Sequence, residues 1–142
     1  MQINSNGSIM SLDVGAQRIG VAQANVIARI AHPFDTLQHT DTIFDDITAL
    51  LRKEQAIALV VGLPRGLSGQ ETAQTKYVED FVDQLRPHLS LPIFWQDEAV
   101  TSQKAEAELQ GRKKPYQKGD IDALAAAYIL EDYLREHKGE TA

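Results

Sequence analysis

The order of strand-like and helix-like segments is the feature that most restricts the fold. Residues 8–14 and 18–24 are apolar segments joined by a three-residue connection that contains Gly15, which is typical of a β-hairpin. A weaker third strand is predicted over 28–37, where Pro33 favours an edge position. Three strands therefore precede the first helix, and strands joined so closely are expected to pair antiparallel.

After residue 40 the pattern changes. Apolar residues recur every three or four positions up to about 53, which predicts a helix. The run 57–61 is apolar without alternation, as expected for a strand covered on both faces. The remaining predicted elements are a helix from about 71 to 86, a strand at 92–96, a helix from Thr101 or Ser102 to Gly111, and a last helix over 122–137.

Strands that alternate with helices imply right-handed crossovers and parallel pairing. The expected fold class is therefore α/β. We expect a five-stranded mixed sheet of three antiparallel strands plus two parallel ones, flanked by helices on both faces. With 142 residues, 43% of them hydrophobic, the chain is expected to form one domain over 1–142.

Composition excludes several kinds of chemistry. The chain has no cysteine, which rules out disulfides, zinc-thiolate sites and cysteine nucleophiles, and fits a reducing compartment. Any metal is therefore held by oxygen or imidazole. The longest apolar run, 56–64, is far shorter than the ~20 residues of a membrane span, and the polar segment 2–8 is unlike a signal peptide. We expect a cytoplasmic protein without membrane contact.

The net charge of −6 argues against a partner as negative as nucleic acid. A basic stretch around Tyr116 departs from this average and consists of Arg112, Lys113, Lys114 and Lys118. Such a stretch can meet phosphates locally, but charge runs are also commonly solvated surface. Charge alone leaves both interpretations open.

Asp13 interrupts the first apolar strand, and an isolated buried carboxylate is costly unless something compensates it. One interpretation is a turn aspartate that accepts hydrogen bonds from amides of the Gly15 loop. The other is a metal ligand. Position alone does not decide between them.

Two further acids are expected near the sheet. Glu98 follows the strand 92–96, and the carboxyl ends of parallel strands are where open α/β sheets bind ligands. Asp122 opens the last predicted helix on a small apolar face, and Asp120 is the better candidate for its N-cap. If Asp13, Glu98 and Asp122 converge, their oxygens suit Mg²⁺ or Mn²⁺.

Several segments occur in an order that resembles one known family. They are 13–22 (DVGAQRIGVA), 61–64 with Gly69, Asp97-Glu98 followed by Thr101-Ser102, the basic stretch, and 121–126 (IDALAA). Together they span about Met10 to Leu134 and resemble the YqgF family of Holliday junction resolvases, also regarded as nucleases that mature small-subunit ribosomal RNA. The resemblance implies an RNase H-like fold and a phosphodiester-cleaving hydrolase. It also implies that Asp13, Glu98 and Asp122 are the catalytic, metal-holding residues.

One position departs from the family pattern. Ala99 follows the Asp97-Glu98 pair, where the family often has arginine, and Arg18, Arg65 or Arg112 are candidates to replace that cation. The expected nucleic-acid-binding residues are Arg18, Arg65, Arg112, Lys113, Lys114 and Lys118.

The favoured function is metal-dependent endonuclease cleavage of structured nucleic acid, at the 5′ end of pre-16S rRNA in ribosome biogenesis. Two alternatives stay open: a Holliday junction resolvase acting in DNA recombination and repair, and a noncatalytic RNA-binding module. A resolvase of a two-fold junction is expected to form a homodimer.

Overall fold

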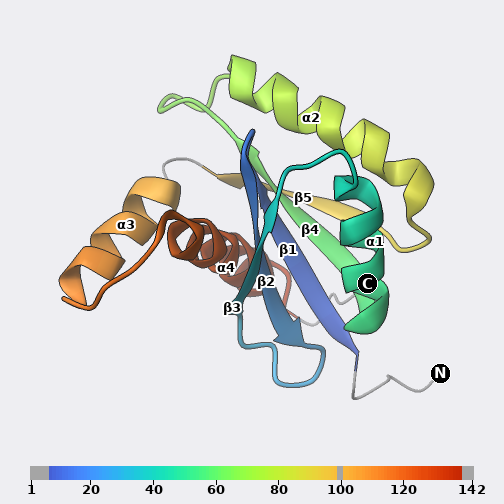
Figure 1. Ribbon diagram of the computed structural model, residues 1–142, viewed down its shortest axis with the longest axis horizontal. Coiled ribbons are helices and arrows are strands. Elements are labelled where there is room, and N and C mark those ends of the chain that lie inside the picture. Colours follow the sequence, from blue (N-terminus) through green and yellow to red (C-terminus); the bar gives the residue numbers. More distant parts are fainter. Residues whose placement is uncertain (1–6, 99–100, 139–142) are drawn as a thin grey trace.

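A computed structural model describes residues 7–98 and 101–138, which form one mixed sheet with helices on both sides (Figure 1). The strands are β1 Ser8–Val14, β2 Arg18–Asn25, β3 His32–Gln38, β4 Ala56–Pro64 and β5 Ile93–Glu98, in the order β3-β2-β1-β4-β5. The helices are α1 Ile43–Lys53, α2 Ala73–Leu85, the 3₁₀ helix η1 Arg86–His88, α3 Thr101–Gly111 and α4 Lys118–Glu136. Strands β1, β2 and β3 pair antiparallel, whereas β1, β4 and β5 pair parallel. The predicted five-stranded mixed sheet is confirmed.

The sheet separates two apolar layers. Met10, Leu12 and Val14 of β1 pack with α1 and α2, whereas Ile9 belongs to the layer under α3 and α4. Period-two alternation along β1 therefore assigns its odd-numbered residues, Asp13 included, to the side of α4. Figure 1 shows α1 and α2 on one side of the sheet and α3 and α4 on the other.

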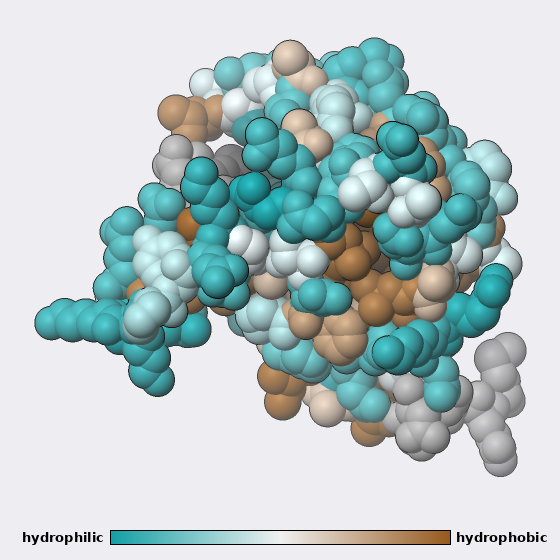
Figure 2. Space-filling view, viewed as in Figure 1, coloured by the Kyte–Doolittle hydropathy of each residue, from teal (hydrophilic) through white to brown (hydrophobic). Residues whose placement is uncertain are grey.

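Small residues bring α4 close to the sheet. Ala123 to Ala127 are all buried, and α4 packs against β2, β3 and β1. Strand β4 lies between β1 and β5 and is buried from Ala58 to Leu63, which confirms the predicted inner strand. The face in Figure 2 is mainly hydrophilic, with hydrophobic residues gathered in a central patch beside α1.

Two predicted boundaries near the edge strand and the last strand are wrong. Strand β3 begins at His32 rather than at 28, because Asn25 Oδ1 accepts the backbone N–H groups of Ile27 and Ala28 and turns the chain, with Arg29 at φ 55°. Pro33 does lie on the edge strand, as predicted. Strand β5 continues through Glu98, so this acid ends the strand instead of following it.

The start of the last helix is also wrong. Helix α4 begins at Lys118, four residues before the predicted start, and Gln117 rather than Asp120 is its N-cap. Asp120 is the third helical residue, and its Oδ2 accepts the backbone N–H of Gln117 at 2.8 Å. Asp122 therefore lies one turn inside the helix. In the part of the chain that the structure describes, none of the helices has the length and apolar character to cross a membrane.

Candidate active site

Asp13 and Asp122 lie together where α4 crosses β1. Two residues before Asp13 on the same strand face, Ser11 Oγ donates to the carbonyl oxygen of Ala126 at 2.7 Å. Asp122 lies one helical turn before Ala126, so the next α4-facing residue of β1 meets it. The charge of Asp122 acts on the Asp13 carboxyl accordingly. The two-residue alternation along β1 and the helical repeat of α4 therefore bring these two carboxylates to the same place.

Gly20 lets the helix come this close. It pairs with Asp13 across β1 and β2. A Cβ atom on Gly20 would lie only 1.9 Å from the carbonyl oxygen of Asp122, so no other residue fits beneath the helix without moving it. Gly20 is not among the site residues predicted from the sequence, although a glycine inside a strand is a known sign of a close backbone approach.

The pair is short of positive charge. Burial, and then the charge of Asp122, raise the pKa of Asp13 from 3.8 to about 7. Two carboxylates in such a place require a proton or a cation between them. The causes of this raised pKa include no hydrogen bond from the Gly15 loop, and the Gly15 N–H donates to the carbonyl oxygen of Arg18. These observations favour the metal-ligand interpretation over the turn interpretation.

Arg18 stands beside the pair. Its Nε donates to Asp122 Oδ2 at 2.6 Å, and both side chains are partly buried. Arg18 begins β2, directly after the short hairpin that follows Asp13. Of the three arginines considered as replacements for the missing cation, it is the one in contact with a candidate catalytic acid. Ala99 itself lies outside the described residues.

Glu98 has different neighbours. Gln96, on the same face of β5, donates to Glu136 Oε2 at 3.0 Å, and the Glu98 carboxyl is hydrogen-bonded to Asp132. Asp132 lies roughly 15 Å along α4 from Asp122, at about 1.5 Å per residue. The structure thus brings Asp13 and Asp122 together but not Glu98 with them. Within 7–98 and 101–138, no group of three or more Asp, Glu, His or Cys side chains is arranged to hold a metal ion.

The Glu98–Asp132 contact is a shared-proton pair. Burial first, then the hydrogen bond and charge of Asp132, raise the pKa of Glu98 to about 9. Burial opposes ionisation of Asp132 as well, but hydrogen bonds from Glu98 and Arg135 outweigh it and lower its pKa. Glu98 Oε1 is buried and has no hydrogen-bond partner among the described residues. That oxygen keeps its lone pairs available for a cation.

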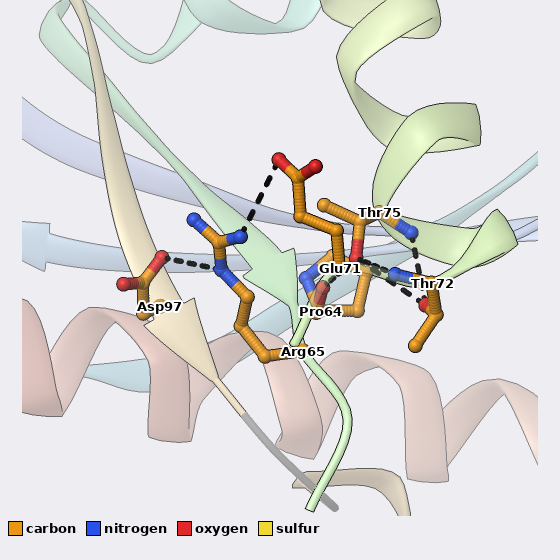
Figure 3. A network of polar contacts seen from close by, with 6 residues as sticks. All are labelled: Pro64, Arg65, Glu71, Thr72, Thr75 and Asp97. Atoms are coloured by element: carbon orange, nitrogen blue, oxygen red, sulfur yellow. Dashed lines mark hydrogen bonds and ion pairs between the residues drawn. The ribbon is translucent and has the colours of Figure 1, made fainter. Parts of the chain in front are cut away.

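Arg65 has a structural role (Figure 3). It follows β4, where its Nε lies 3.4 Å from Asp97 Oδ1 and its Nη1 lies 3.6 Å from Glu71 Oε1. Nearby, Thr75 Oγ1 donates to the carbonyl oxygen of Pro64 and joins Thr72 in the capping box of α2. These contacts tie the loop after β4 to β5 and α2.

The basic stretch lies on the surface. All four of its cations are exposed: Arg112, Lys113, Lys114 and Lys118. Arg112 pairs with Glu108 one turn earlier in α3, and Lys113 adopts φ 55° just after that helix. Lys118 is the first residue of α4. The stretch therefore connects α3 to the helix that carries Asp122.

The mixed sheet and the helices that cover it form a resolvase-like fold. The structure of Fowlpox virus resolvase with Holliday junction DNA matches 91% of this chain and 97% of that chain with a TM-score of 0.55 at 11% identity, a likeness in fold alone. The RuvX family, described as Holliday junction resolvase, matches residues 7–136, and the chain belongs to this family, which confirms the YqgF resemblance.

Curated relatives are similar in sequence to this chain over most of their own length. A protein of Roseiflexus sp. (strain RS-1) is 42% identical over 90% of this chain and 94% of its own. One from Sulfurihydrogenibium sp. (strain YO3AOP1) is 36% identical over 89% of this chain and 88% of its own. Both carry the name "Putative pre-16S rRNA nuclease".

Proposed function

We propose that this chain is a metal-dependent nuclease that hydrolyses phosphodiester bonds at the 5′ end of pre-16S rRNA. The observation that carries the proposal is the partly buried pair of Asp13 and Asp122, where α4 packs on β1, with Arg18 beside it. The relatives named as pre-16S rRNA nucleases support the choice of substrate. We also propose that the protein acts in the cytoplasm, where ribosomal RNA precursors are matured.

The donor set favours Mg²⁺ or Mn²⁺ over softer metals, because the chain has no cysteine and the pair offers only carboxylate oxygens. Such an ion, when bound, supplies positive charge at the scissile phosphate and acidity to water. Asp13 and Asp122 are the proposed ligands, and Asp13 must give up its proton to act as one. Glu98 is the proposed third ligand, for which its side chain has to leave Asp132.

Arg18 holds the second ligand in place. Its bond to Asp122 Oδ2 orients that carboxylate and leaves the guanidinium next to the pair, where a phosphate oxygen is a further acceptor. The exposed Arg112, Lys113, Lys114 and Lys118 are the proposed contacts to more distant phosphates. Arg65 is a weaker candidate for a phosphate contact, because its guanidinium already pairs with Asp97 and Glu71.

A Holliday junction resolvase is the second candidate, favoured by the family description and by the resolvase-like fold. It predicts a homodimer, since a four-way junction has two-fold symmetry. A noncatalytic RNA-binding module is the third, favoured by the position of Glu98 away from the carboxylate pair.

A substrate comparison separates the three. The purified chain is offered a pre-16S rRNA fragment and a four-way DNA junction, each with Mn²⁺ and with a chelator. We expect Mn²⁺-dependent cleavage of the rRNA fragment, abolished by Asp13→Asn and retained by Asp83→Asn, an exposed acid of α2 that serves as the matched control. Preferential cleavage of the junction favours the resolvase, and binding of the rRNA without cleavage favours the module.

A further inference from the structure

A furrow runs along the surface between β3 and α4. Its first part has a volume of about 620 Å³ and is lined by Arg18, by Phe34 and Thr36 of β3, and by Lys118. Its second part is lined by Tyr116, Arg112, Lys114 and Leu109. The two parts share Pro33, Asp120 and Ala123 in their linings, so they adjoin each other along the surface.

The furrow begins at the carboxylate pair. Arg18 lines its first part and bonds to Asp122, so that end of the furrow lies next to Asp13 and Asp122. Its other end lies between the last turn of α3 and the loop before α4. Hydrophilic side chains cover this outer end of α3 in Figure 2. A polymer in the furrow would therefore lead away from the proposed cleavage site.

The furrow is locally basic although the chain is acidic. Four cations line it: Arg18, Arg112, Lys114 and Lys118. The two acids in its lining are engaged by backbone groups, since Asp35 accepts the N–H of Thr36 at 2.8 Å and Asp120 accepts that of Gln117 at 2.8 Å. Two of the four cations also pair with acids outside the lining, Arg18 with Asp122 and Arg112 with Glu108. Lys114 and Lys118 are therefore the main source of positive charge in the furrow, which in a chain of net charge −6 favours a polyanion at this place.

An aromatic ring lies in each part of the furrow. Phe34 is 36% exposed on the edge strand, so part of its ring is accessible from the furrow. Tyr116 is half-buried within the basic stretch, flanked by Lys114 and Lys118. Aromatic faces separated by cations are the features with which proteins bind unpaired nucleotides, because the bases stack while the phosphates meet the cations.

We propose that this furrow binds a single-stranded RNA segment that extends from the scissile phosphate. The proposal rests on the proposed function for the identity of the RNA. Arg18 and Lys118 contact the phosphates nearest the site, Phe34 stacks on a base, and Tyr116 stacks on a base further along the strand. An unpaired strand is favoured over a duplex because the faces of paired bases are covered by their neighbours.

Photo-crosslinking and binding test the furrow without cleavage. In an Asp13→Asn background with a chelator, we measure anisotropy of a labelled single-stranded RNA and crosslink a 5-iodouridine version of it. We expect Phe34→Ala and Tyr116→Ala each to weaken binding by roughly tenfold, as the loss of an aromatic ring that stacks on a base does in other proteins. Lys114→Glu and Lys118→Glu should weaken it and lower the salt dependence by about one phosphate contact each.

Two control variants lie outside the furrow. Leu67→Ala removes an exposed apolar side chain, and Lys76→Glu reverses an exposed cation on α2. Both should bind RNA like the parent, and circular dichroism checks that every variant is folded. We expect crosslinks within 33–38 and 112–120.

Three outcomes would overturn the proposal: crosslinks confined to other segments, unchanged binding by Phe34→Ala and Tyr116→Ala, or equal affinity for blunt duplex RNA with equal losses in the variants. The proposed function fails separately. If the unmodified chain does not cleave pre-16S rRNA but the furrow variants lose RNA binding, the furrow is supported and the nuclease proposal is not.

Discussion

The two halves of α4 each face a carboxylate on the sheet, but the two contacts differ. At Asp122 the partner is Asp13 near the end of β1, and Arg18 lies beside them. At Asp132 the partner is Glu98 from the end of β5, and the two acids share a proton near Arg135. Among the described contacts the first pair has no hydrogen bond between its two carboxyl groups, and Asp122 bonds to Arg18 instead, whereas the two acids of the second pair are bonded to each other. The first pair is therefore the better place for a cation.

The largest effect is expected from substitutions that remove one carboxylate of the first pair. Asp13→Asn or Asp122→Asn removes a carboxylate from the proposed metal site, and we expect cleavage to fall by roughly 10³-fold or more, because a catalytic metal contributes several kcal/mol to transition-state stabilisation. The measurement is the single-turnover rate on the pre-16S rRNA fragment in Mn²⁺. Asp97→Asn, an exposed acid of β5 that pairs only with Arg65 in the described contacts, is the matched control. An unchanged rate in Asp13→Asn would remove this residue from the mechanism.

Crowding the first pair should cost stability. Gly20→Ala places a methyl group where the Asp122 carbonyl lies, and we expect the free energy of unfolding to fall by about 3 kcal/mol, at the upper end of overpacking effects. Urea denaturation measures this. Gly111→Ala is the control, since a Cβ there meets no atom within 4 Å. Equal stability of the two variants would mean that α4 can shift away from β2 at little cost.

How well the sequence predicted this region depends on what positions each residue. The sequence identified Asp13 as a carboxylate inside an apolar strand and Asp122 as lying on a small apolar helix face, because both features follow from local patterns. The start of α4 was missed because Gln117 is a weak cap signal compared with the acids that follow it. The neighbour of Glu98 depends on the angle at which α4 crosses the sheet. That angle follows from close contacts such as Gly20 under Asp122 and Gly62 under Ile129. A strand glycine signals a close approach but does not identify the residue that approaches.

The first pair should also make stability depend on pH. In the unfolded chain Asp13 ionises with its ordinary pKa of 3.8, whereas the folded chain keeps the proton up to about pH 7. Within this window the unfolded state has released a proton that the folded state still holds, so stability falls as pH rises and levels off above pH 7. From pH 5 to pH 8 the loss from Asp13 is about 3 kcal/mol.

The measurement compares unfolding free energies of the parent chain and Asp13→Asn at the two pH values, in chelator. Between pH 5 and pH 8 the free energy of unfolding of the parent should fall by about 3 kcal/mol more than that of the variant. Mn²⁺ should reduce the difference, since an ion replaces the proton between the carboxylates. Parallel pH profiles for the two proteins would show that Asp13 ionises in the fold as easily as in the unfolded chain.

The smallest effect is expected from a substitution that releases Glu98 from Asp132 in the second pair. Asp132→Ala removes the hydrogen-bond partner of Glu98, so the third proposed ligand no longer has to break that bond to reach an ion. One such bond contributes about 1 kcal/mol, and we expect Mn²⁺ affinity measured by calorimetry to rise by roughly fivefold. Glu131→Ala, an exposed acid of the same helix, should leave the affinity unchanged. In the double variant Glu98→Gln with Asp132→Ala the gain should disappear. If the gain persists there, the effect of Asp132 is general electrostatics of α4, and the metal site consists of the Asp13–Asp122 pair without Glu98.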